Sequence, residues 1–142
     1  MSHSLSRIWI HIIFGTKDRQ PLIETEYSEN IHRRIVENFE KRNSPVMIIN
    51  GTADHVHVLF QLTPEKSLAE LIKLVKAETA NWINRQDLIE SNFAWQTGYA
   101  AFSVSESQVD TVEEYIRQQI EHHRKRSYQE EVDLFLEKYG LK

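Results

Sequence analysis

Residues 54–60, DHVHVLF, alternate polar and apolar side chains in the way that a β-strand requires. Successive side chains on a strand point to opposite faces, so His55 and His57 share one face with Leu59. The other face is apolar and carries Val56, Val58, Phe60 and Leu62. The segment therefore predicts a strand whose apolar face meets a core and whose other face carries a histidine pair.

Strand patterns and helix patterns follow one another along the rest of the chain. Short apolar runs rich in β-branched or aromatic residues predict strands at 6–15, 45–50, 55–62 and 93–105, the last as a hairpin or a bent strand around Gly98. Apolar residues at helical intervals predict helices at 23–43, 67–83 and 107–126, and a tail helix within about 127–142.

The first six elements follow the order strand, helix, strand, strand, helix, strand, which is that of ferredoxin-like folds. We therefore predict an α+β fold with a ferredoxin-like, RRM-like antiparallel sheet and two helices on one face. The histidine pair should lie on the other, open face, with the third helix near it. No linker or repeat divides the sequence, so we expect a single domain spanning 1–142.

Composition limits the classes of function. The 142 residues include 17 Lys and Arg against 21 Asp and Glu, so the formal net charge is −4 and any binding of nucleic acid must be local. Cysteine is absent, which excludes disulfides and thiolate zinc sites. The apolar run near the amino end has the length of a strand, and we expect a cytoplasmic protein that does not enter membranes.

The third predicted helix adds a polar band next to its apolar stripe. At about 100° per residue, Tyr115, Gln119, His122 and Arg126 form one narrow row. If the stripe docks beside the sheet, this row comes over the histidine pair. His55, His57 and Gln119 would then form a three-ligand metal site with Tyr115 within reach.

This set of groups suits phosphodiester cleavage. A divalent ion can withdraw charge from a phosphate oxygen and stabilise the leaving alkoxide, while the Tyr115 oxygen attacks phosphorus and forms a covalent intermediate. A phosphotyrosine conserves the bond energy for a later rejoining. The chemistry therefore favours strand transfer over simple hydrolysis.

The same residues resemble a known family. The sequence HVH at 55–57 fits the signature of HUH nucleases. The helix YIRQQIEHHRK resembles the catalytic helix of the small single-tyrosine transposases of insertion sequences, the transposase A type, and of their repeat-associated relatives. The likeness extends over nearly the whole chain, through GTKDRQPLI, LAELIKLVKAETANWI and WQTGYAAFSVSES.

The resemblance implies that Tyr115 is the nucleophile and that His55, His57 and Gln119 bind the metal. It also implies a 5′-phosphotyrosine bond with single-stranded DNA, recognition of hairpins at element ends, and a homodimer whose subunits share the active site. Magnesium or manganese is the implied ion, whereas imidazole ligands alone would favour zinc, nickel or copper. The sequence leaves open whether Tyr115 acts in its own subunit or in the partner.

Basic residues could form a local surface for phosphates despite the net acidic charge, with a strong dependence on salt. The candidates for DNA contact are Lys17, Arg19, Lys73, Lys76, Arg117, His122, Arg124 and Arg126.

Other functions remain open at this point. The same fold serves as a non-catalytic, RRM-like module for single-stranded nucleic acid. A domesticated HUH nuclease would keep the site without mobility. A third alternative is a metal hydrolase that activates water and forms no covalent intermediate.

Overall fold

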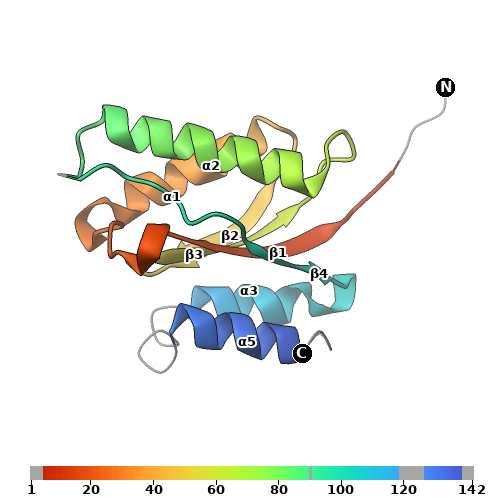
Figure 1. Ribbon diagram of the computed structural model, residues 1–142. Helices are drawn as coiled ribbons and strands as arrows, with labels where there is room; N and C mark the ends of the chain where they lie inside the picture. Colours follow the sequence, from red (N-terminus) through yellow and green to blue (C-terminus); the bar gives the residue numbers. More distant parts are fainter. Residues whose placement is uncertain (1–4, 90, 119–126, 139–142) are drawn as a thin grey trace.

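The computed structural model describes residues 5–89, 91–118 and 127–138 (Figure 1). Its sheet has four antiparallel strands in the order β2-β3-β1-β4. The strands are β1 (Trp9–Gly15), β2 (Val46–Gly51), β3 (His55–Gln61) and β4 (Ala100–Val104). The two strands at the centre, β1 and β3, are neighbours in space but not in sequence, which is the arrangement predicted for a ferredoxin-like fold. The fold class is confirmed.

Two long helices cover one face of this sheet, as predicted (Figure 1). They are α1 (Thr25–Glu40) and α2 (Leu68–Arg85). Ser67 precedes Glu70 at the three-residue spacing of a helix-capping box, and its hydroxyl accepts a hydrogen bond from the Glu70 amide at 3.1 Å at the start of α2. Beneath the helices lies a core of fully buried apolar side chains, among them Ile12, Phe14, Ile31, Ile35, Phe39, Val56, Val58, Phe60, Leu71 and Val75.

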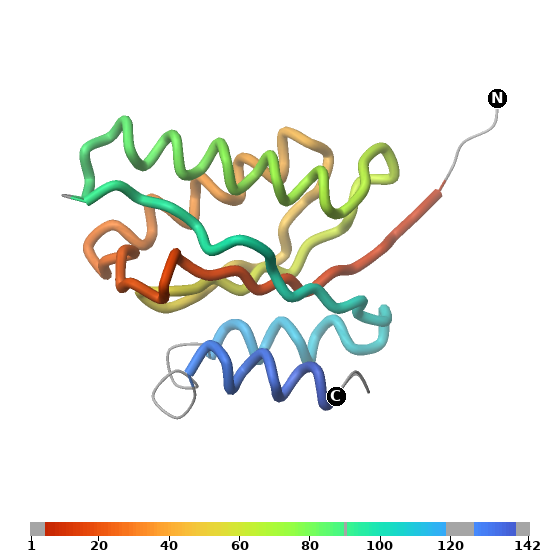
Figure 2. Tube along the Cα trace, viewed as in Figure 1, coloured from red at the N-terminus to blue at the C-terminus, as the bar shows by residue number. Residues whose placement is uncertain are grey.

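The opposite face of the sheet is covered too, so the expectation of an open face is wrong. Helices α3 (Val109–Arg117) and α5 (Tyr128–Lys138) pack there as an antiparallel pair, which can be followed in Figure 2. His55 and His57 are consequently fully buried, with 0% of each side chain exposed. The amphipathic tail supplies this cover because its apolar stripe needs a surface to pack against.

The tyrosine helix begins and ends differently from the prediction. A short 3₁₀ turn (Glu106–Gln108) precedes α3, which ends at Arg117, and Gln118 already leaves helical geometry. The predicted continuation to Arg126 falls in 119–126, outside the described residues.

Residues 93–98 run as an extended segment beside the first strand and do not form a hairpin. Trp95 makes a single bridge to Thr16, and β4 follows after Gly98. The ammonium group of Lys76 donates to the carbonyls of Gln96 and Gly98, each at 2.8 Å, and so ties this segment to α2. None of the helices in the described ranges is long and apolar enough to cross a membrane.

Candidate active site

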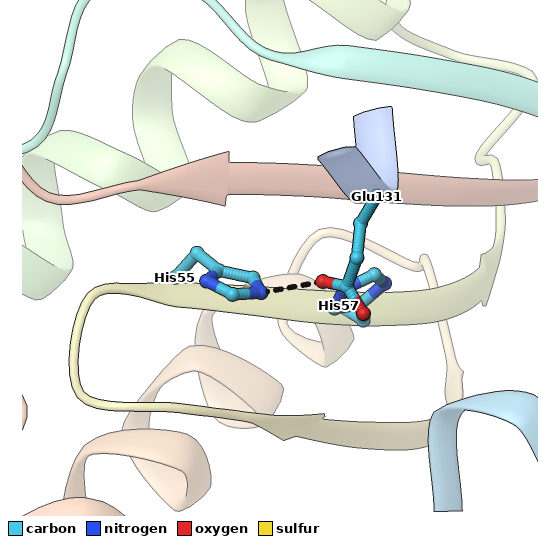
Figure 3. A group of neighbouring side chains, drawn as sticks. All are labelled: His55, His57 and Glu131. Carbon is cyan, nitrogen blue, oxygen red and sulfur yellow. Dashed lines mark hydrogen bonds and ion pairs between the residues drawn. The ribbon is translucent and has the colours of Figure 1, made fainter. Parts of the chain in front are cut away.

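Four polar side chains from three elements meet beneath the sheet. His55 and His57 come from β3, Tyr115 from α3 and Glu131 from α5. One carboxylate oxygen of Glu131, Oε2, lies 2.8 Å from His55 Nε2 and 3.1 Å from His57 Nε2 (Figure 3). The other oxygen, Oε1, accepts a hydrogen bond from the Tyr115 hydroxyl at 3.0 Å. The tyrosine and the histidine pair therefore converge, as the sequence predicted, on a carboxylate that it did not indicate.

Strand pairing determines which way the histidines point. On β3, Val56 and Val58 pack toward α1 and α2, so His55 and His57 point to α3 and α5. On the neighbouring central strand, Ile13 pairs with His57 and Gly15 with His55. The pair thus lies in the middle of the sheet, where backbone hydrogen bonds on both sides keep it rigid.

A second carboxylate holds the ring of His55. Its Nδ1 lies 2.6 Å from Asp54 Oδ1 and 3.0 Å from the Thr52 hydroxyl. Burial alone lowers the pKa of His55, but the hydrogen bonds and negative charges of Asp54 and Glu131 outweigh burial and raise this pKa above its ordinary value. Because Asp54 accepts the proton on Nδ1, Nε2 is the nitrogen that faces Glu131 and that would bind an ion after losing its proton.

A third histidine, His11 on the neighbouring strand β1, contacts His57. His11 Nε2 lies 2.9 Å from His57 Nδ1, and the two rings stack with their centroids 5.1 Å apart. Burial, followed by the nearby charge of His57, lowers the pKa of His11 well below its ordinary value, so His11 is neutral. His11 Nδ1 has no hydrogen-bond partner in the described part of the chain. His11 is therefore a buried group that orients His57.

Tyr115 owes its position to the packing of α3. The apolar stripe of this helix, Val109, Val112 and Ile116, packs on Trp9, Leu59 and Val104 of the sheet. The side-chain amide of Asn50 on β2 donates to the carbonyls of Ile116 and Arg117, each at 3.1 Å. Asn50 thus ties the edge strand β2 to the last turn of α3, the turn that carries Tyr115.

Glu131 is the site residue that sequence reasoning missed. It is 0% exposed, on a helix whose apolar side chains Tyr128, Val132, Phe135 and Leu136 pack beside the sheet. Glu131 lies one turn before Phe135 and so falls on the buried stripe. An acidic residue within an apolar stripe was the available signal, because carboxylates are rarely fully buried without a partner.

Several predicted site residues fall outside the described residues. These are Gln119, His122, Arg124 and Arg126. Gln119 stays a prediction as the third metal ligand, and the other three stay predictions as DNA contacts.

Of the remaining basic candidates, Arg19 lies nearest to the site. Its guanidinium group stacks 3.7 Å above the centre of the Tyr128 ring, which in turn meets the His55 ring edge to face at 5.2 Å. Lys17 is exposed two residues earlier, after the end of β1. The Arg19 guanidinium therefore lies beside the His55 end of the site.

The other basic candidates have different surroundings. Lys73 is exposed on α2 and Lys76 ties α2 to the segment before β4, both in the layer across the sheet from the histidines (Figure 1). Burial lowers the pKa of Lys76. Arg117 is exposed at the end of α3 and pairs with Glu113 at 3.1 Å and Glu114 at 3.6 Å.

The donor set at the centre fits a divalent ion. One nitrogen from each of His55 and His57 and one oxygen from Glu131 lie within 4.8 Å of one another. Two imidazoles and a carboxylate are ligands that divalent transition ions accept, and hard ions such as magnesium and manganese prefer the oxygen donor. The two histidines come from the sheet and Glu131 from the helix that covers it, so the three donors meet between these two layers.

Comparison with known proteins identifies the family of this chain. Residues 4–119 match the family described as "Transposase IS200 like". The ISDra2 transposase TnpA of Deinococcus radiodurans is 21% identical over 114 residues, which cover 77% of this chain and 81% of the relative.

Two solved structures share the fold. A crystal structure described as a transposase from Deinococcus radiodurans has a TM-score of 0.63 at 19% identity, covering 84% of this chain and 95% of the other. A REP-associated tyrosine transposase bound to a REP hairpin has a TM-score of 0.58 at 14% identity, covering 83% and 72%. Since the family match covers most of the sequence, this chain belongs to the IS200-like transposases.

Proposed function

We propose that this protein cleaves and rejoins single-stranded DNA at the ends of a mobile element through a covalent bond to Tyr115. The observation that carries the proposal is the convergence of Tyr115 and the histidine pair on one carboxylate, with the Tyr115 hydroxyl 3.0 Å from Glu131. A nucleophile and a metal-binding pair within one buried cluster are what cleavage by a tyrosine requires.

In the proposed reaction the Tyr115 oxygen forms a bond to phosphorus and the bond from phosphorus to the 3′ oxygen breaks. The phenol loses its proton as it attacks, and the departing 3′ oxygen takes up a proton to become a hydroxyl. The product is a 5′-phosphotyrosine, which the 3′ hydroxyl of another strand can attack in the reverse sense. Tyrosine needs an activating environment, because its ordinary pKa is near 10.

His55 and His57 hold the divalent ion in this proposal, and Gln119 remains the predicted third ligand. When bound, magnesium or manganese would withdraw charge from a phosphate oxygen. Asp54 and His11 orient the two imidazoles, at 2.6 and 2.9 Å respectively, which fixes the nitrogens that face the ion.

The proposed substrate is single-stranded DNA that forms a hairpin. A structural relative bound to a REP hairpin supports this choice. We propose Lys17 and Arg19, beside the His55 end of the cluster, as the described basic residues nearest to the reacting phosphate. A transposase of this type acts on DNA in the cytoplasm, which stays our prediction for its location.

The test is formation of a DNA adduct. The full chain is incubated with hairpin-containing single strands from the flanks of its gene and with Mn²⁺, then resolved on a denaturing gel. We expect an adduct that survives denaturation and is absent in Tyr115→Phe. The control is Tyr128→Phe, since the Tyr128 ring contacts His55 but lies on α5.

The outcomes separate the alternatives. Cleavage without an adduct, retained in Tyr115→Phe, would indicate a metal hydrolase and overturn the proposal. DNA binding without cleavage, insensitive to a chelator and to His57→Ala, would indicate an RRM-like binding module.

A mixing experiment addresses the sharing of the site. The resemblance implies a homodimer with exchanged tyrosine helices, whereas this chain brings Tyr115 within 5.9 Å of its own His57, measured between ring centroids. His57→Ala and Tyr115→Phe are each expected to be inactive, and a mixture that stays inactive would indicate that Tyr115 acts in its own subunit. Restored cleavage in the mixture would instead support exchange between subunits.

A further inference from the structure

We infer that Glu131 is a ligand of the divalent ion and also positions Tyr115, so that helix α5 is part of the metal centre and its docking is coupled to metal binding. This inference rests on the proposed function, since it concerns the same ion. It adds a ligand from the tail, a segment beyond the residues that match the transposase family.

The distances around Glu131 fit those between neighbouring ligands of one ion. Bonds of about 2.1 Å at right angles separate two ligand atoms by about 3.0 Å. Glu131 Oε2 lies 2.8 Å from His55 Nε2 and 3.1 Å from His57 Nε2 (Figure 3). One oxygen thus hydrogen-bonds both imidazoles at separations that shared coordination of one ion also allows.

Burial gives a second, independent reason. Glu131 is 0% exposed, and taking a carboxylate out of water costs several kcal/mol unless a positive charge compensates it. Its place on the α5 stripe, one turn before buried Phe135, would serve the packing of the helix better as leucine or methionine. Without an ion, His55 and His57 supply this charge through ion pairs with Glu131 at 2.8 and 3.1 Å. A divalent ion bound among the three groups would take over that role.

The second oxygen of Glu131 explains how the helix would serve the reaction. Oε1 accepts the Tyr115 hydroxyl at 3.0 Å while Oε2 faces the histidines. A single carboxylate therefore spans the proposed ion and the proposed nucleophile. It holds the phenol oxygen next to the ion, where the phosphate would bind.

The ligand chemistry favours Glu131 over a neutral amide. Imidazole pairs select zinc, nickel or copper, whereas magnesium and manganese prefer charged oxygen donors. With a carboxylate as the third ligand beside His55 and His57, the preference of the ligand set moves from zinc, nickel or copper toward manganese. Gln119 offers only a neutral amide oxygen, so its removal should weaken Mn²⁺ binding less than the removal of Glu131.

The experiment measures Mn²⁺ affinity of the DNA-free full chain by titration with EPR detection of free Mn²⁺. Groups that merely orient a ligand contribute about 10–100-fold to metal affinity. We therefore expect Glu131→Gln to weaken binding at least about ten-fold and Glu131→Ala to weaken it further. The matched control is Glu137→Gln, exposed on the same helix, which should leave the affinity unchanged.

A second measurement guards against variants that unfold. Hydrogen exchange of the wild-type amides of α5 should slow when Mn²⁺ binds, because the ion ties this helix to the sheet. Near-UV circular dichroism checks that Glu131→Gln keeps native packing. Mn²⁺ should then no longer protect α5 in this variant.

Two results would overturn the inference. Unchanged affinity in Glu131→Gln together with no protection of α5 would mean that the carboxylate is not a ligand. Tighter binding in Glu131→Gln would mean that Glu131 competes with the ion for the histidines. Failure of the proposed function looks different: the wild type would then not bind Mn²⁺, or His57→Ala would bind it equally well.

Discussion

The two faces of the sheet are built from the same two central strands, yet they are stabilised in different ways. On the face under α1 and α2, β1 and β3 contribute Ile12, Phe14, Val58 and Phe60 to an apolar core. On the face under α3 and α5 the alternate residues include His11, His55 and His57, all fully buried. Apolar contacts are non-directional, whereas each buried imidazole needs a particular partner. The face under α1 and α2 therefore contributes mainly to stability, and the face under α3 and α5 carries the groups suited to chemistry.

The largest expected effect on stability lies on the apolar face. Phe60 is 0% exposed and its ring centroid lies 4.6 Å from that of Phe39. Phe60→Ala should lower the free energy of unfolding by about 3–5 kcal/mol, because it removes apolar contacts and leaves a cavity. Urea unfolding at pH 7 measures this loss. A loss below about 1 kcal/mol would contradict the assignment of this face as the main core.

Replacement of His57, three residues before Phe60, is expected to cause a smaller loss of stability and a larger loss of function. His57→Ala removes the partner of His11 and one partner of Glu131, which should cost about 1–3 kcal/mol in unfolding free energy. Adduct formation should fall about 10³-fold, since the metal contributes several kcal/mol to such reactions. Stability and adduct yield are measured on the same preparation. Near-normal cleavage by a folded His57→Ala protein would contradict the assignment of a catalytic role to the face that carries His57.

An intermediate case is Asn50, which joins the edge strand β2 to α3. Asn50→Ala should cost about 1 kcal/mol, because the carbonyls of Ile116 and Arg117 lose their donor. The rate of adduct formation should fall more than DNA affinity does, since Tyr115 lies on the loosened turn. Asn30→Ala, exposed on α1, is the control. Equal losses of affinity and rate would argue against a positioning role.

The smallest expected effect is on the pH dependence of stability, which distinguishes His32 on the apolar face from His55 on the other face. Burial lowers the pKa of His32 on α1 to about 4, whereas two carboxylates raise that of His55. Between pH 6.5 and about 4 the unfolded chain binds a proton at His32 that the folded chain does not. The contribution of His32 to stability therefore falls as the pH falls through this range.

The contribution of His55 to stability changes with pH in the opposite direction. Its raised pKa makes a stabilising contribution that is complete below pH 6.5 and is lost as the pH rises through the folded value. Urea midpoints between pH 4.5 and 7.5 test the His32 effect. His32→Gln should reduce the acid-side slope by less than about 1.4 kcal/mol per pH unit. An unchanged slope would show that His32 does not contribute.

Much of the fold could be predicted because its signals are local. The alternation in residues 54–60 gave the strand and both its faces, and Ser67 with Glu70 marked the start of α2. The length of the tyrosine helix could not be read in this way. Its periodicity continues past Arg117, whereas α3 ends there, where Asn50 from a distant strand donates to the carbonyls of Ile116 and Arg117. Packing from elsewhere in the chain overrides a local pattern.

Residue spacing alone predicted the order of the elements and the shared face of His55 and His57 on one strand. The approach of the Tyr115 helix to this pair was predicted only on the condition that its apolar stripe docks beside the sheet, and from the resemblance to the transposase family. Only the tertiary structure decided what covers the second face and that Glu131, 74 residues after His57, joins the histidines to Tyr115. That contact depends on how α3 and α5 pack on the sheet. Local residue patterns do not predict packing between segments that are distant in the sequence.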